Sequence, residues 1–434
     1  MNSYVIQGGE KLKGEVTINA SKNSAVAILI ASLLNEKRTI IKNIPKIEEV
    51  YRIIEVLQSI GVFVKWCKPH ELEIIPSEKL NLNKINIEAA EKTRSIILFL
   101  GPLIHKLKKF SLPNCGGCKL GRRTIIPHLY ALEEFGIKIK STDDKLLIDS
   151  SKIHSADKVI MYESGDTATE NAIMVAAMIP AKTIIKFASA NYQVQDLCKF
   201  LSKLGVKIEG IGTTTLTISG KEKLSKEIEF YLTEDPIEAM LFLSLAATTN
   251  SSIMIKRCPI DFLELELLKL KKMGFRFKII KKYKSKNHFG KLVDIATFPS
   301  ILVAAVEKIY ARPFPGLNMD NLPFFVPIAT QAKGKTLIHD WVYENRAIYY
   351  TEFRRLGAKI TLADPHRVFI EGPTKLIAAE MISPSALRPS ASLLVAMLAA
   401  KGKSVLKNTY AIERGYEDLV GRLKKLGAHI QVQN

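Results

Sequence analysis

The chain has 434 residues, of which 47% are hydrophobic, 24% charged and 8% aromatic, and 63 lysines and arginines against 43 acidic residues give a net charge of +20. This composition is typical of a globular protein and excludes a disordered chain, and no apolar stretch approaches the roughly 20 residues of a membrane-spanning helix. The length is sufficient for two or three domains. Because five scattered cysteines do not form a disulfide framework, we expect a protein of a reducing compartment, the cytoplasm.

The amino-terminal residues, MNSYVIQGGEK, lack an apolar stretch behind a basic start, so we expect no export signal, and Tyr4–Gln7 is predicted as a strand. Further along, an apolar helix of small residues followed by a β-branched strand recurs. Examples are SAVAILIASLLNEKRTIIKNI (24–44), NAIMVAAMIPAKTIIKFA (171–188), EAMLFLSLAATTNSSIMIKRC (238–258) and SASLLVAMLAAKGKSVLKNTY (390–410). Helices that are apolar nearly all round are typical of buried helices.

A second pattern follows each of these: the end of an amphipathic helix, a glycine and an alternating strand. Its copies lie about 70 residues apart, which is the sign of a repeat architecture. We predict that each glycine follows a helix end in the left-handed conformation. The six glycines are Gly61, Gly136, Gly205, Gly274, Gly357 and Gly427.

Together the two patterns predict an α/β protein of six βαβαββ repeats. Six repeats exceed one hydrophobic core, so we expect two lobes of three repeats each. One lobe comprises residues 22–229 and carries a cysteine-containing loop, and the other comprises residues 1–21 together with 230–434. Because the chain crosses twice between the lobes, we expect a hinge and a cleft.

The loop PNCGGCKLGRR (113–123) is rich in glycine and surrounds Cys118 with Lys119, Arg122 and Arg123. Neighbouring cations lower the pKa of a thiol, so Cys118 is a candidate acid, base or nucleophile. Two other interpretations are a redox pair with Cys115 and half of a zinc site. No second C-x-x-C or suitable histidine pair supports zinc.

Several cations stand beside turn-like residues at similar places in successive repeats. Arginine binds phosphate and carboxylate through paired hydrogen bonds, so this set predicts a convergent anion site. The basic excess also suits a nucleic-acid binder or a surface of solvated lysines, but no arginine-rich tail favours nucleic acid. Asp320, after RPFPGLNM, is either a helix N-cap or a general base among these cations. The cations are Lys22, Arg94, Arg346, Arg388 and Arg414.

These motifs together resemble the enolpyruvyl transferase family over essentially the whole chain. The resemblance rests on the repeats and on ASKN (20–23), TRS (93–95), GGCKLGRR (116–123), PFPG (313–316) with MD (319–320), ENR (344–346), LRPSAS (387–392) and ERGYE (413–417). It implies the inside-out α/β barrel type of fold. The cysteine loop indicates the branch that acts on UDP-N-acetylglucosamine at the first committed step of peptidoglycan synthesis, not the shikimate branch.

The resemblance also implies site residues, with no metal, organic cofactor, nucleic acid or membrane involved; the oligomeric state stays open. Cys118 would protonate the enol methylene of phosphoenolpyruvate, and Asp320 would take the proton of the acceptor hydroxyl. Residues that would bind phosphoenolpyruvate are Lys22, Asn23, Arg123, Arg346, Arg388 and Arg414. Residues that would bind the nucleotide sugar are Arg94, Arg123, Thr124, Ile125, Ile126, Pro127, Asp320 and Val342.

Most departures from the family pattern lie on the nucleotide side, and the exception on the phosphoenolpyruvate side is Ala386. Ala386 stands where the family has Asp, and Gly165-Asp166-Thr167 stands where the nucleotide phosphates are expected, so an acid would repel them unless its side chain points away. Other departures are Leu98, Ile126, Pro236 and the segment 188–193. Two interpretations follow: a divergent member of the same branch, or a paralogue that uses another acceptor. Less favoured alternatives are an RNA-end-processing relative, whose nucleotidylated histidine would be His128, and a non-catalytic anion-binding relative.

Overall fold

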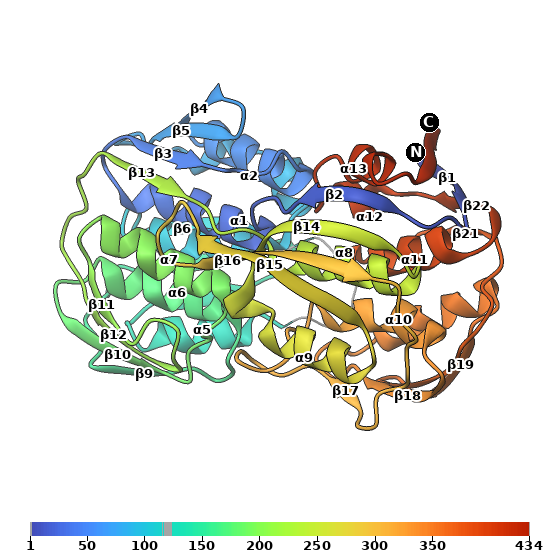
Figure 1. Cartoon of the computed structure of the whole chain (residues 1–434). Helices are drawn as coiled ribbons and strands as arrows, with labels where there is room; N and C mark the ends of the chain where they lie inside the picture. The colour runs from blue at the N-terminus through green and yellow to red at the C-terminus, as the bar shows by residue number, and fades with distance from the viewer. Residues whose placement is uncertain (1, 115, 117–123, 434) are drawn as a thin grey trace. The chain divides into compact units, whose positions relative to one another are not determined.

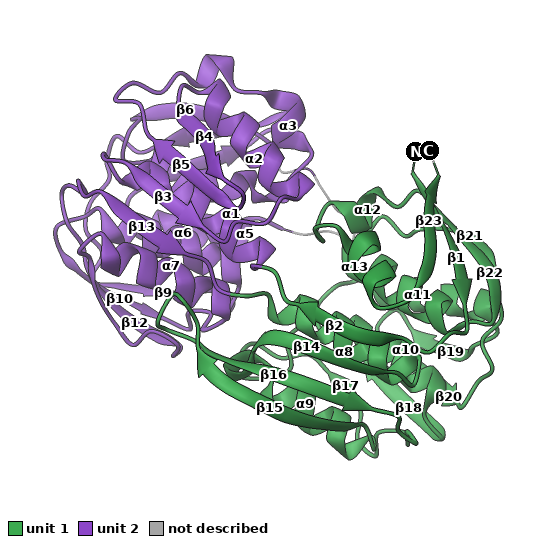
Figure 2. Cartoon of the chain, turned by 45° about the horizontal axis from the view of Figure 1, so that its top comes forward, with its two compact units in different colours: residues 1–19, 118–123, 234–434 green, residues 20–117, 124–233 purple. Residues whose placement is uncertain are grey.

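A computed structural model describes residues 2–114, 116 and 124–433. The chain divides into two compact units (Figure 2). Unit 1 holds the amino-terminal residues up to Asn19 together with the chain from Glu234 onward, and unit 2 holds the described residues from Ala20 to Thr233. The division falls a few residues from the predicted boundaries at 22 and 229, because strand β13 (Ile228–Tyr231) pairs with β3 (Thr39–Lys42) within unit 2.

Unit 2 contains three sheets and the helices of the first three repeats (Figure 1). The sheets run in the order β13-β3-β5-β4, β6-β8-β7 and β11-β12-β10-β9. The remaining strands are β4 (Phe63–Lys68), β5 (Glu71–Ile75), β6 (Lys109–Pro113), β7 (Lys138–Ser141), β8 (Lys145–Asp149), β9 (Lys158–Ile160), β10 (Lys182–Lys186), β11 (Lys207–Glu209) and β12 (Thr215–Ser219). The helices are α1 (Lys22–Ala31), η1 (Ser32–Leu34), α2 (Glu48–Ser59), η2 (Leu82–Lys84), α3 (Ile87–Glu91), η3 (Arg94–Phe99), α4 (Leu100–Leu103), α5 (Ile126–Glu133), α6 (Asp166–Ala177) and α7 (Tyr192–Lys203).

Unit 1 contains three four-stranded sheets, in the order β15-β16-β14-β2, β17-β18-β20-β19 and β21-β22-β1-β23. The strands are β1 (Ser3–Gly8), β2 (Lys13–Thr17), β14 (Ser252–Pro259), β15 (Arg276–Lys284), β16 (Lys291–Phe298), β17 (Ile309–Tyr310), β18 (Gly334–His339), β19 (Lys359–Asp364), β20 (Arg367–Gly372), β21 (Glu380–Ile382), β22 (Gly402–Lys407) and β23 (His429–Gln433). The helices are α8 (Pro236–Thr248), η4 (Ile260–Phe262), α9 (Glu264–Lys272), η5 (Leu322–Phe324), α10 (Phe325–Gln331), η6 (Ala347–Leu356), α11 (Leu387–Ala399), α12 (Tyr410–Glu413) and α13 (Leu419–Lys425).

Three strands complete repeats that are distant in the sequence. β13 pairs in parallel with β3 in the first repeat, and β2 pairs in parallel with β14 in the fourth. The predicted amino-terminal strand is confirmed as β1, which lies between β22 and β23 in the last sheet. Each unit is therefore closed by strand pairing between residues far apart along its chain.

The glycines predicted to follow helix ends are confirmed in the left-handed conformation, with φ between 76° and 101° at all six positions. In every copy the residue after the glycine donates its backbone N–H to the carbonyl five residues earlier, as Val62 does to Leu57 at 3.0 Å and Val206 to Leu201 at 3.1 Å. This bond satisfies a carbonyl that the end of a helix would otherwise leave without a partner.

The small-residue helices are buried, as their composition predicts. Every residue of α8 is buried, and so are Ser24–Ala31 of α1. Helices α8, α10 and α11 pack against one another in unit 1, and α1 and α6 both pack against α7 in unit 2. No helix among the described residues is long and apolar enough to cross a membrane.

The sheet of the second repeat departs from the predicted four strands, because its described part has only β6, β8 and β7. The segment that would supply the fourth strand, 76–86, begins with Pro76 and contains three asparagines. Asn81 caps η2 and Asn86 caps α3 through their side chains. Asparagine side chains that bond to nearby backbone favour caps and turns over a strand.

Candidate active site

In unit 1, the structure brings two of the predicted arginines to the carboxylate of a third predicted residue, Asp320. Arg388 Nε lies 3.2 Å from Asp320 Oδ2, and Arg346 Nη1 lies 4.0 Å from Oδ1. The N-cap of η5 is Asn321, with no side-chain capping bond, so the N-cap interpretation of Asp320 is wrong. The carboxylate instead faces two guanidinium groups, which stabilise its ionised form.

Arg346 is held by Asp340, a residue that the sequence analysis did not single out. Arg346 Nε donates to Asp340 Oδ2 at 2.6 Å and Nη2 donates to Oδ1 at 2.8 Å, while Nη2 also donates to the carbonyl of Met319 at 2.7 Å. Arg346 is only 1% exposed. Burial is the largest single effect and opposes its charge, but the Asp340 carboxylate, together with Tyr350 and Tyr343, raises the pKa of the guanidinium. Asp340 therefore fixes the orientation of Arg346 beside Asp320.

Arg388 lies in the first turn of α11 and is nearly buried. Its Nη1 donates to the hydroxyl of Tyr416 at 2.7 Å, and its guanidinium lies over the Tyr416 ring, 5.3 Å from the centroid. Ala386, which departs from the family's Asp, is the N-cap of α11 and provides no side-chain cap. Alanine at an N-cap costs about 0.5–2 kcal/mol relative to aspartate. The departure therefore removes both a carboxylate and a helix cap close to Arg388.

Asp235 is a second carboxyl near Arg388 and, unlike Asp320, it is buried. It caps α8 by accepting the backbone N–H of Ile237 at 2.7 Å and of Glu238 at 3.3 Å, and the departing residue Pro236 opens the helix. Burial raises the pKa of Asp235 to about 6, against the lowering effect of Arg388. The raised pKa makes the stability of the folded chain depend on pH.

We expect Asp235→Asn to flatten the stability profile between about pH 4 and pH 6. In that window the unfolded chain loses the Asp235 proton while the folded chain keeps it, so the free energy of unfolding of the wild-type protein falls as the pH rises. A shift of about two pKa units corresponds to roughly 3 kcal/mol, and asparagine keeps the cap without titrating. Urea unfolding of both proteins at several pH values tests this; parallel profiles would contradict it.

In unit 2, the predicted residues Lys22 and Asn23 begin helix α1. The helix is capped by Ser21, whose hydroxyl accepts the backbone N–H of Ser24 at 3.2 Å. Asn23 Nδ2 donates to the hydroxyl of Tyr192 at 3.1 Å, which joins the start of α1 to the start of α7. Both predicted residues are half-buried, so their side chains remain partly open to solvent.

Five of the residues predicted to bind the nucleotide sugar, Arg94 and Thr124 to Pro127, lie in unit 2 around the start of α5, whereas Asp320 and Val342 lie in unit 1. Arg94 Nη2 donates to the carbonyl of Thr124 at 3.2 Å, and the backbone N–H of Ile126 donates to the Thr124 hydroxyl at 3.1 Å. Pro127 lies in the first turn of α5, Ile125 is its half-buried N-cap, and Ile126 is 40% exposed. Arg94 thus holds the backbone of this run.

His128 connects this run to the start of α6. Its Nδ1 lies 2.9 Å from Asn171 Nδ2 and its Nε2 lies 3.2 Å from the Thr167 hydroxyl, so Nδ1 accepts and Nε2 donates. Burial, and then the charge of Arg94, lowers its pKa to about 3. A buried neutral histidine with both nitrogens bonded is a structural group, which disfavours the nucleotidylated histidine of the RNA-end-processing alternative.

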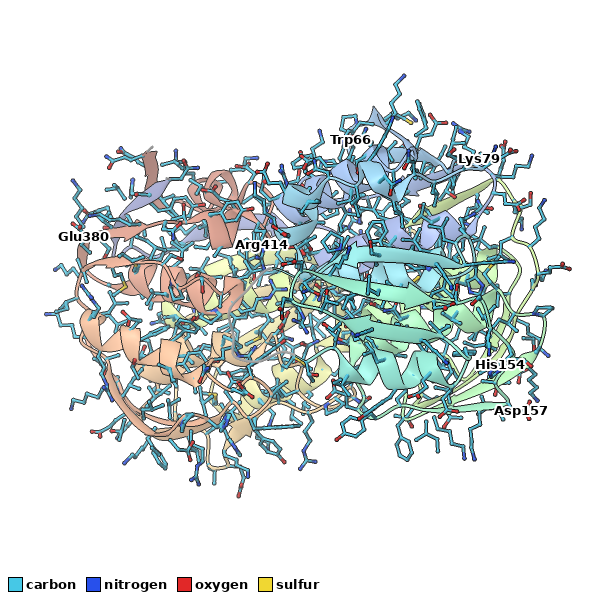
Figure 3. All side chains as sticks on the ribbon, turned by 180° about the vertical axis from the view of Figure 1, so that it is seen from behind. Trp66, Lys79, His154, Asp157, Glu380 and Arg414 are labelled. Carbon is cyan, nitrogen blue, oxygen red and sulfur yellow. The ribbon has the colours of Figure 1, made fainter. Side chains whose placement is uncertain are left out.

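The remaining predicted residues divide between described and undescribed parts. Cys118 and Arg123 lie outside the described residues, as does Cys115. Arg414 directly follows α12 (Figure 3) and is half-buried, and Tyr416, two residues later, connects this segment to Arg388. Val342 is half-buried. Among the described residues no three His, Cys, Asp or Glu side chains group as metal ligands.

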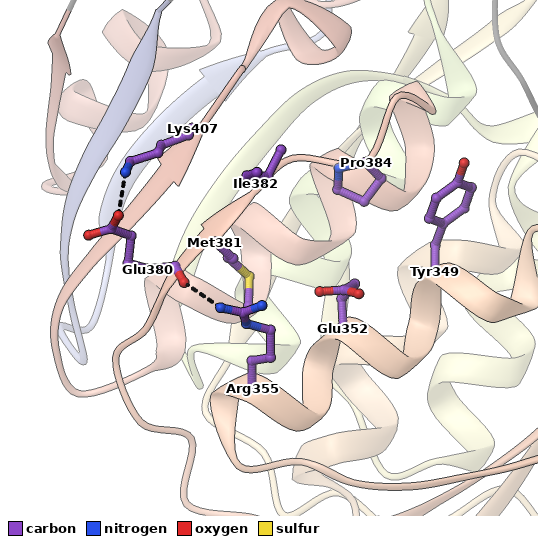
Figure 4. Close-up of a pocket in the computed structure, with 8 residues that line it drawn as sticks. All are labelled: Tyr349, Glu352, Arg355, Glu380, Met381, Ile382, Pro384 and Lys407. Atoms are coloured by element: carbon purple, nitrogen blue, oxygen red, sulfur yellow. Dashed lines mark hydrogen bonds and ion pairs between the residues drawn. The ribbon is translucent and has the colours of Figure 1, made fainter.

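A separate pocket of about 520 Å³ opens in unit 1 beside η6 and β21 (Figure 4). Glu380 pairs with Lys407, and its carbonyl accepts from Arg355 Nη2 at 3.2 Å. The pocket contains none of the predicted site residues. Its lining residues are Tyr349, Glu352, Arg355, Glu380, Met381, Ile382, Pro384 and Lys407.

Solved structures with the same fold include an enolpyruvyl transferase, NikO from Streptomyces tendae. It superposes with a TM-score of 0.86 at 22% identity, covering 100% of this chain and 99% of that one. EPSP synthase from Acinetobacter baumannii superposes with a TM-score of 0.77 at 18% identity, covering 100% of both chains. At these identities the comparison concerns the fold alone, and it confirms the predicted enolpyruvyl transferase type.

Sequence comparisons extend over the full length. The chain is 35% identical over 439 aligned positions to a UDP-N-acetylglucosamine 1-carboxyvinyltransferase from Treponema denticola, with 100% of each chain covered. It is 32% identical to the protein of the same name from Borreliella burgdorferi, with 99% of each chain covered. The family model of EPSP synthase (3-phosphoshikimate 1-carboxyvinyltransferase) matches residues 6–423. The chain therefore belongs to the EPSP synthase family of carboxyvinyl, or enolpyruvyl, transferases.

Proposed function

We propose that this protein transfers the enolpyruvyl group of phosphoenolpyruvate to the 3-hydroxyl of UDP-N-acetylglucosamine and releases phosphate. The observation that carries the proposal is the Asp320 carboxylate beside Arg388 and Arg346, in a chain whose full-length relatives are named UDP-N-acetylglucosamine 1-carboxyvinyltransferase. A carboxylate in this setting is suited to take a proton from a hydroxyl next to a bound anion. Such an enzyme would act in the cytoplasm, in peptidoglycan synthesis and thus in cell-wall growth, cell shape and division.

The proposed reaction uses protein side chains alone. Asp320 accepts the proton of the 3-hydroxyl while that oxygen bonds to C2 of phosphoenolpyruvate, and the Cys118 thiol donates a proton to C3. The product of this addition is a tetrahedral intermediate that carries phosphate on C2. The Cys118 thiolate then removes a proton from the new methyl group and the double bond re-forms. Phosphate leaves and takes the proton that Asp320 accepted in the first step.

Binding of phosphoenolpyruvate, a small trianion, is assigned to the convergent cations. Arg388 and Arg346 are fixed by buried partners, Tyr416 and Asp340, so their guanidinium groups need little reorganisation when charge develops in the transition state. Preorganised cations of this kind stabilise the developing charge more than mobile surface lysines do. The remaining proposed contacts are Lys22, Asn23, Arg123 and Arg414.

Binding of the nucleotide sugar is assigned to Arg94 and to the run from Arg123 to Pro127, with Asp320 and Val342 as further contacts. The bond from Arg94 to the Thr124 carbonyl supports this assignment, because it fixes the backbone of the run next to a cation. The helix α6 begins nearby, bonded to the run through His128 and Thr167. A helix amino terminus and an arginine both favour bound phosphate.

A second candidate function is enolpyruvyl transfer to a different nucleotide or sugar acceptor. The observation that favours it is the set of departures on the nucleotide side: Asp166 in the first turn of α6, Pro236 at the start of α8 and the exposed apolar Ile126. Each loss of a charge-assisted contact weakens binding by about 1.5–3 kcal/mol. The two candidates share the chemistry and differ only in the acceptor.

Phosphate release from phosphoenolpyruvate tests the two candidates directly. The wild-type protein is incubated with UDP-N-acetylglucosamine, with other uridine nucleotides and with 3-phosphoshikimate in parallel. We expect stoichiometric phosphate release with UDP-N-acetylglucosamine alone. Release with another acceptor only would establish the second candidate, and no release with any acceptor would reject both in favour of a non-catalytic protein.

A further inference from the structure

The first residue of α6, Asp166, has a carboxylate that three side chains of one short segment bind. Ser189 Oγ donates to Oδ1 at 2.5 Å, Asn191 Nδ2 donates to Oδ2 at 3.1 Å and Gln193 Nε2 donates to Oδ2 at 2.5 Å. We call Ser189, Asn191 and Gln193 the carboxylate clamp. Its members are between 2% and 7% exposed, so their donors are largely withdrawn from water.

The clamp is itself fixed to both helices. Asn191 is the N-cap of α7, and its Oδ1 accepts the backbone N–H of Tyr192 at 2.9 Å, which directs Nδ2 toward Asp166. The backbone N–H of Ser189 donates to the Thr169 hydroxyl of α6 at 3.0 Å. The donors therefore hold their positions without the carboxylate having to organise them.

The surroundings of the clamp otherwise favour a bound anion. α6 is a 12-residue helix whose first turn presents backbone N–H groups and the exposed Thr167. His128 bonds to Thr167, and the positive charge of Arg94 contributes to lowering the pKa of His128. The cation Arg94 therefore lies close to the amino terminus of α6. Asp166 is the one acidic residue in the first turn of α6, and it opposes the binding of an anion there.

A second carboxyl, that of Glu170, lies one turn along α6. Glu170 is 1% exposed, and burial, followed by the charge of Asp166, raises its pKa well above the ordinary value. Among the described residues its Oε1 has no hydrogen-bond partner, and burial without a partner disfavours the charged form of a carboxyl. Glu163, which is exposed, places a further carboxylate beside Gly165, the N-cap of α6, whereas the carboxylate of Asp166 in the first turn is bound by the clamp.

We propose that the carboxylate clamp is a specificity-determining element of the acceptor site. By binding both oxygens of Asp166, Ser189, Asn191 and Gln193 hold its charge against the start of α7, so that the amino terminus of α6 can still bind a phosphorylated acceptor. The clamp residues position Asp166 and do not touch the reacting atoms. This inference rests on the proposed function, because it concerns the acceptor of that reaction.

Asn191→Asp tests the clamp with the smallest change of shape. Aspartate keeps the cap oxygen for Tyr192 but turns the donor that faces Asp166 into a second negative oxygen. We expect the KM for UDP-N-acetylglucosamine to rise about tenfold or more, because a charge-assisted contact becomes a repulsion, while the KM for phosphoenolpyruvate changes less than about twofold. In the double variant Asn191→Asp with Asp166→Asn, the amide and the carboxylate exchange places between positions 166 and 191. We expect its KM for UDP-N-acetylglucosamine to return to within about threefold of wild type.

The matched control is Asn86→Asp, the same substitution at the N-cap of α3 in the same unit, where the side chain accepts the backbone N–H of Ala89 at 3.0 Å. It should leave both KM values unchanged. Gln193→Met removes another donor without adding charge, and it replaces Asn191→Asp if that variant does not fold. Melting temperatures of all variants report stability separately from KM.

The outcomes separate the inference from the proposed function. If Asn191→Asp lowers the melting temperature but leaves the acceptor KM unchanged, the clamp has only a structural role and the inference is wrong. If Asp166→Asn alone raises the acceptor KM tenfold, Asp166 contacts the acceptor directly, which also overturns it. If the wild-type protein binds UDP-N-acetylglucosamine but releases no phosphate, the proposed function fails. The clamp is then still tested by calorimetric binding of UDP-N-acetylglucosamine to the wild-type protein and to Asn191→Asp.

Discussion

Replacing Asp320 with Asn should lower kcat by about 10²–10⁴-fold, the usual contribution of a general base. The amide keeps an oxygen that can accept from Arg388, whose Nε lies 3.2 Å from Asp320 Oδ2, so the site should remain assembled. The amide of asparagine, however, cannot take a proton from the acceptor hydroxyl. We therefore expect KM values for both substrates within about threefold of wild type, because binding is retained and proton transfer is lost.

Asp261→Asn is the control for this prediction. Asp261 lies in the same unit and accepts the backbone N–H of Lys291 at 3.2 Å, a bond that involves none of Asp320, Arg346 and Arg388. Steady-state kinetics should show an unchanged kcat for this variant. A kcat for Asp320→Asn within about threefold of wild type would exclude Asp320 as the base and leave it a purely structural partner of the arginines.

Cys118 should react with iodoacetamide before any other cysteine, phosphoenolpyruvate should protect it, and Cys118→Ala should lose kcat by about 10²–10⁴-fold. The structure supplies the contrast for the labelling. Cys198 and Cys258 are buried, and burial raises the pKa of Cys198 to about 12 and that of Cys258 well above its ordinary value. Of the described cysteines, only Cys67 is exposed and competes for the reagent.

Cys67→Ala therefore serves as the control, and it should retain full turnover and the same protection by phosphoenolpyruvate. Mass-spectrometric mapping of the alkylated protein identifies the modified thiol. Modification of Cys115 first would assign the reactive thiol to the other cysteine of the loop. Full turnover by Cys118→Ala would remove the proton donor from the proposed mechanism.

The repeat architecture is predictable from the sequence because its signals are local. A left-handed glycine after a helix end depends on a few neighbouring residues, and so does a helix of small residues that packs on all sides. In the described part of the second repeat one predicted strand is absent, and the reason is clear only from the capping bonds of Asn81 and Asn86, which follow Pro76. The pairing of β13 with β3 and of β2 with β14 joins residues far apart, which no local pattern specifies.

The site is predictable to a lesser extent. Asp320, Arg346 and Arg388 come from short motifs, and the structure brings them together, although their roles stay predictions. The roles of Asp340 and Tyr416 were missed because each acts by binding an arginine, Arg346 or Arg388, and neither the Asp nor the Tyr within the ERGYE motif shows this in the sequence. The Asp166 carboxylate is the clearest case, since the sequence shows an acid near expected phosphates, and only the structure shows that Ser189, Asn191 and Gln193 donate to it.

The central claim is that the enolpyruvyl group is transferred to the 3-hydroxyl of UDP-N-acetylglucosamine, and the structure of the product tests it most directly. Phosphoenolpyruvate labelled with carbon-13 at C2 is turned over by the wild-type protein with UDP-N-acetylglucosamine, and the product is examined by heteronuclear NMR. We predict a long-range correlation between the labelled carbon and the proton on C3 of the sugar, in an enol ether that retains its methylene. A correlation to any other position, or recovery of unreacted phosphoenolpyruvate, would contradict the account.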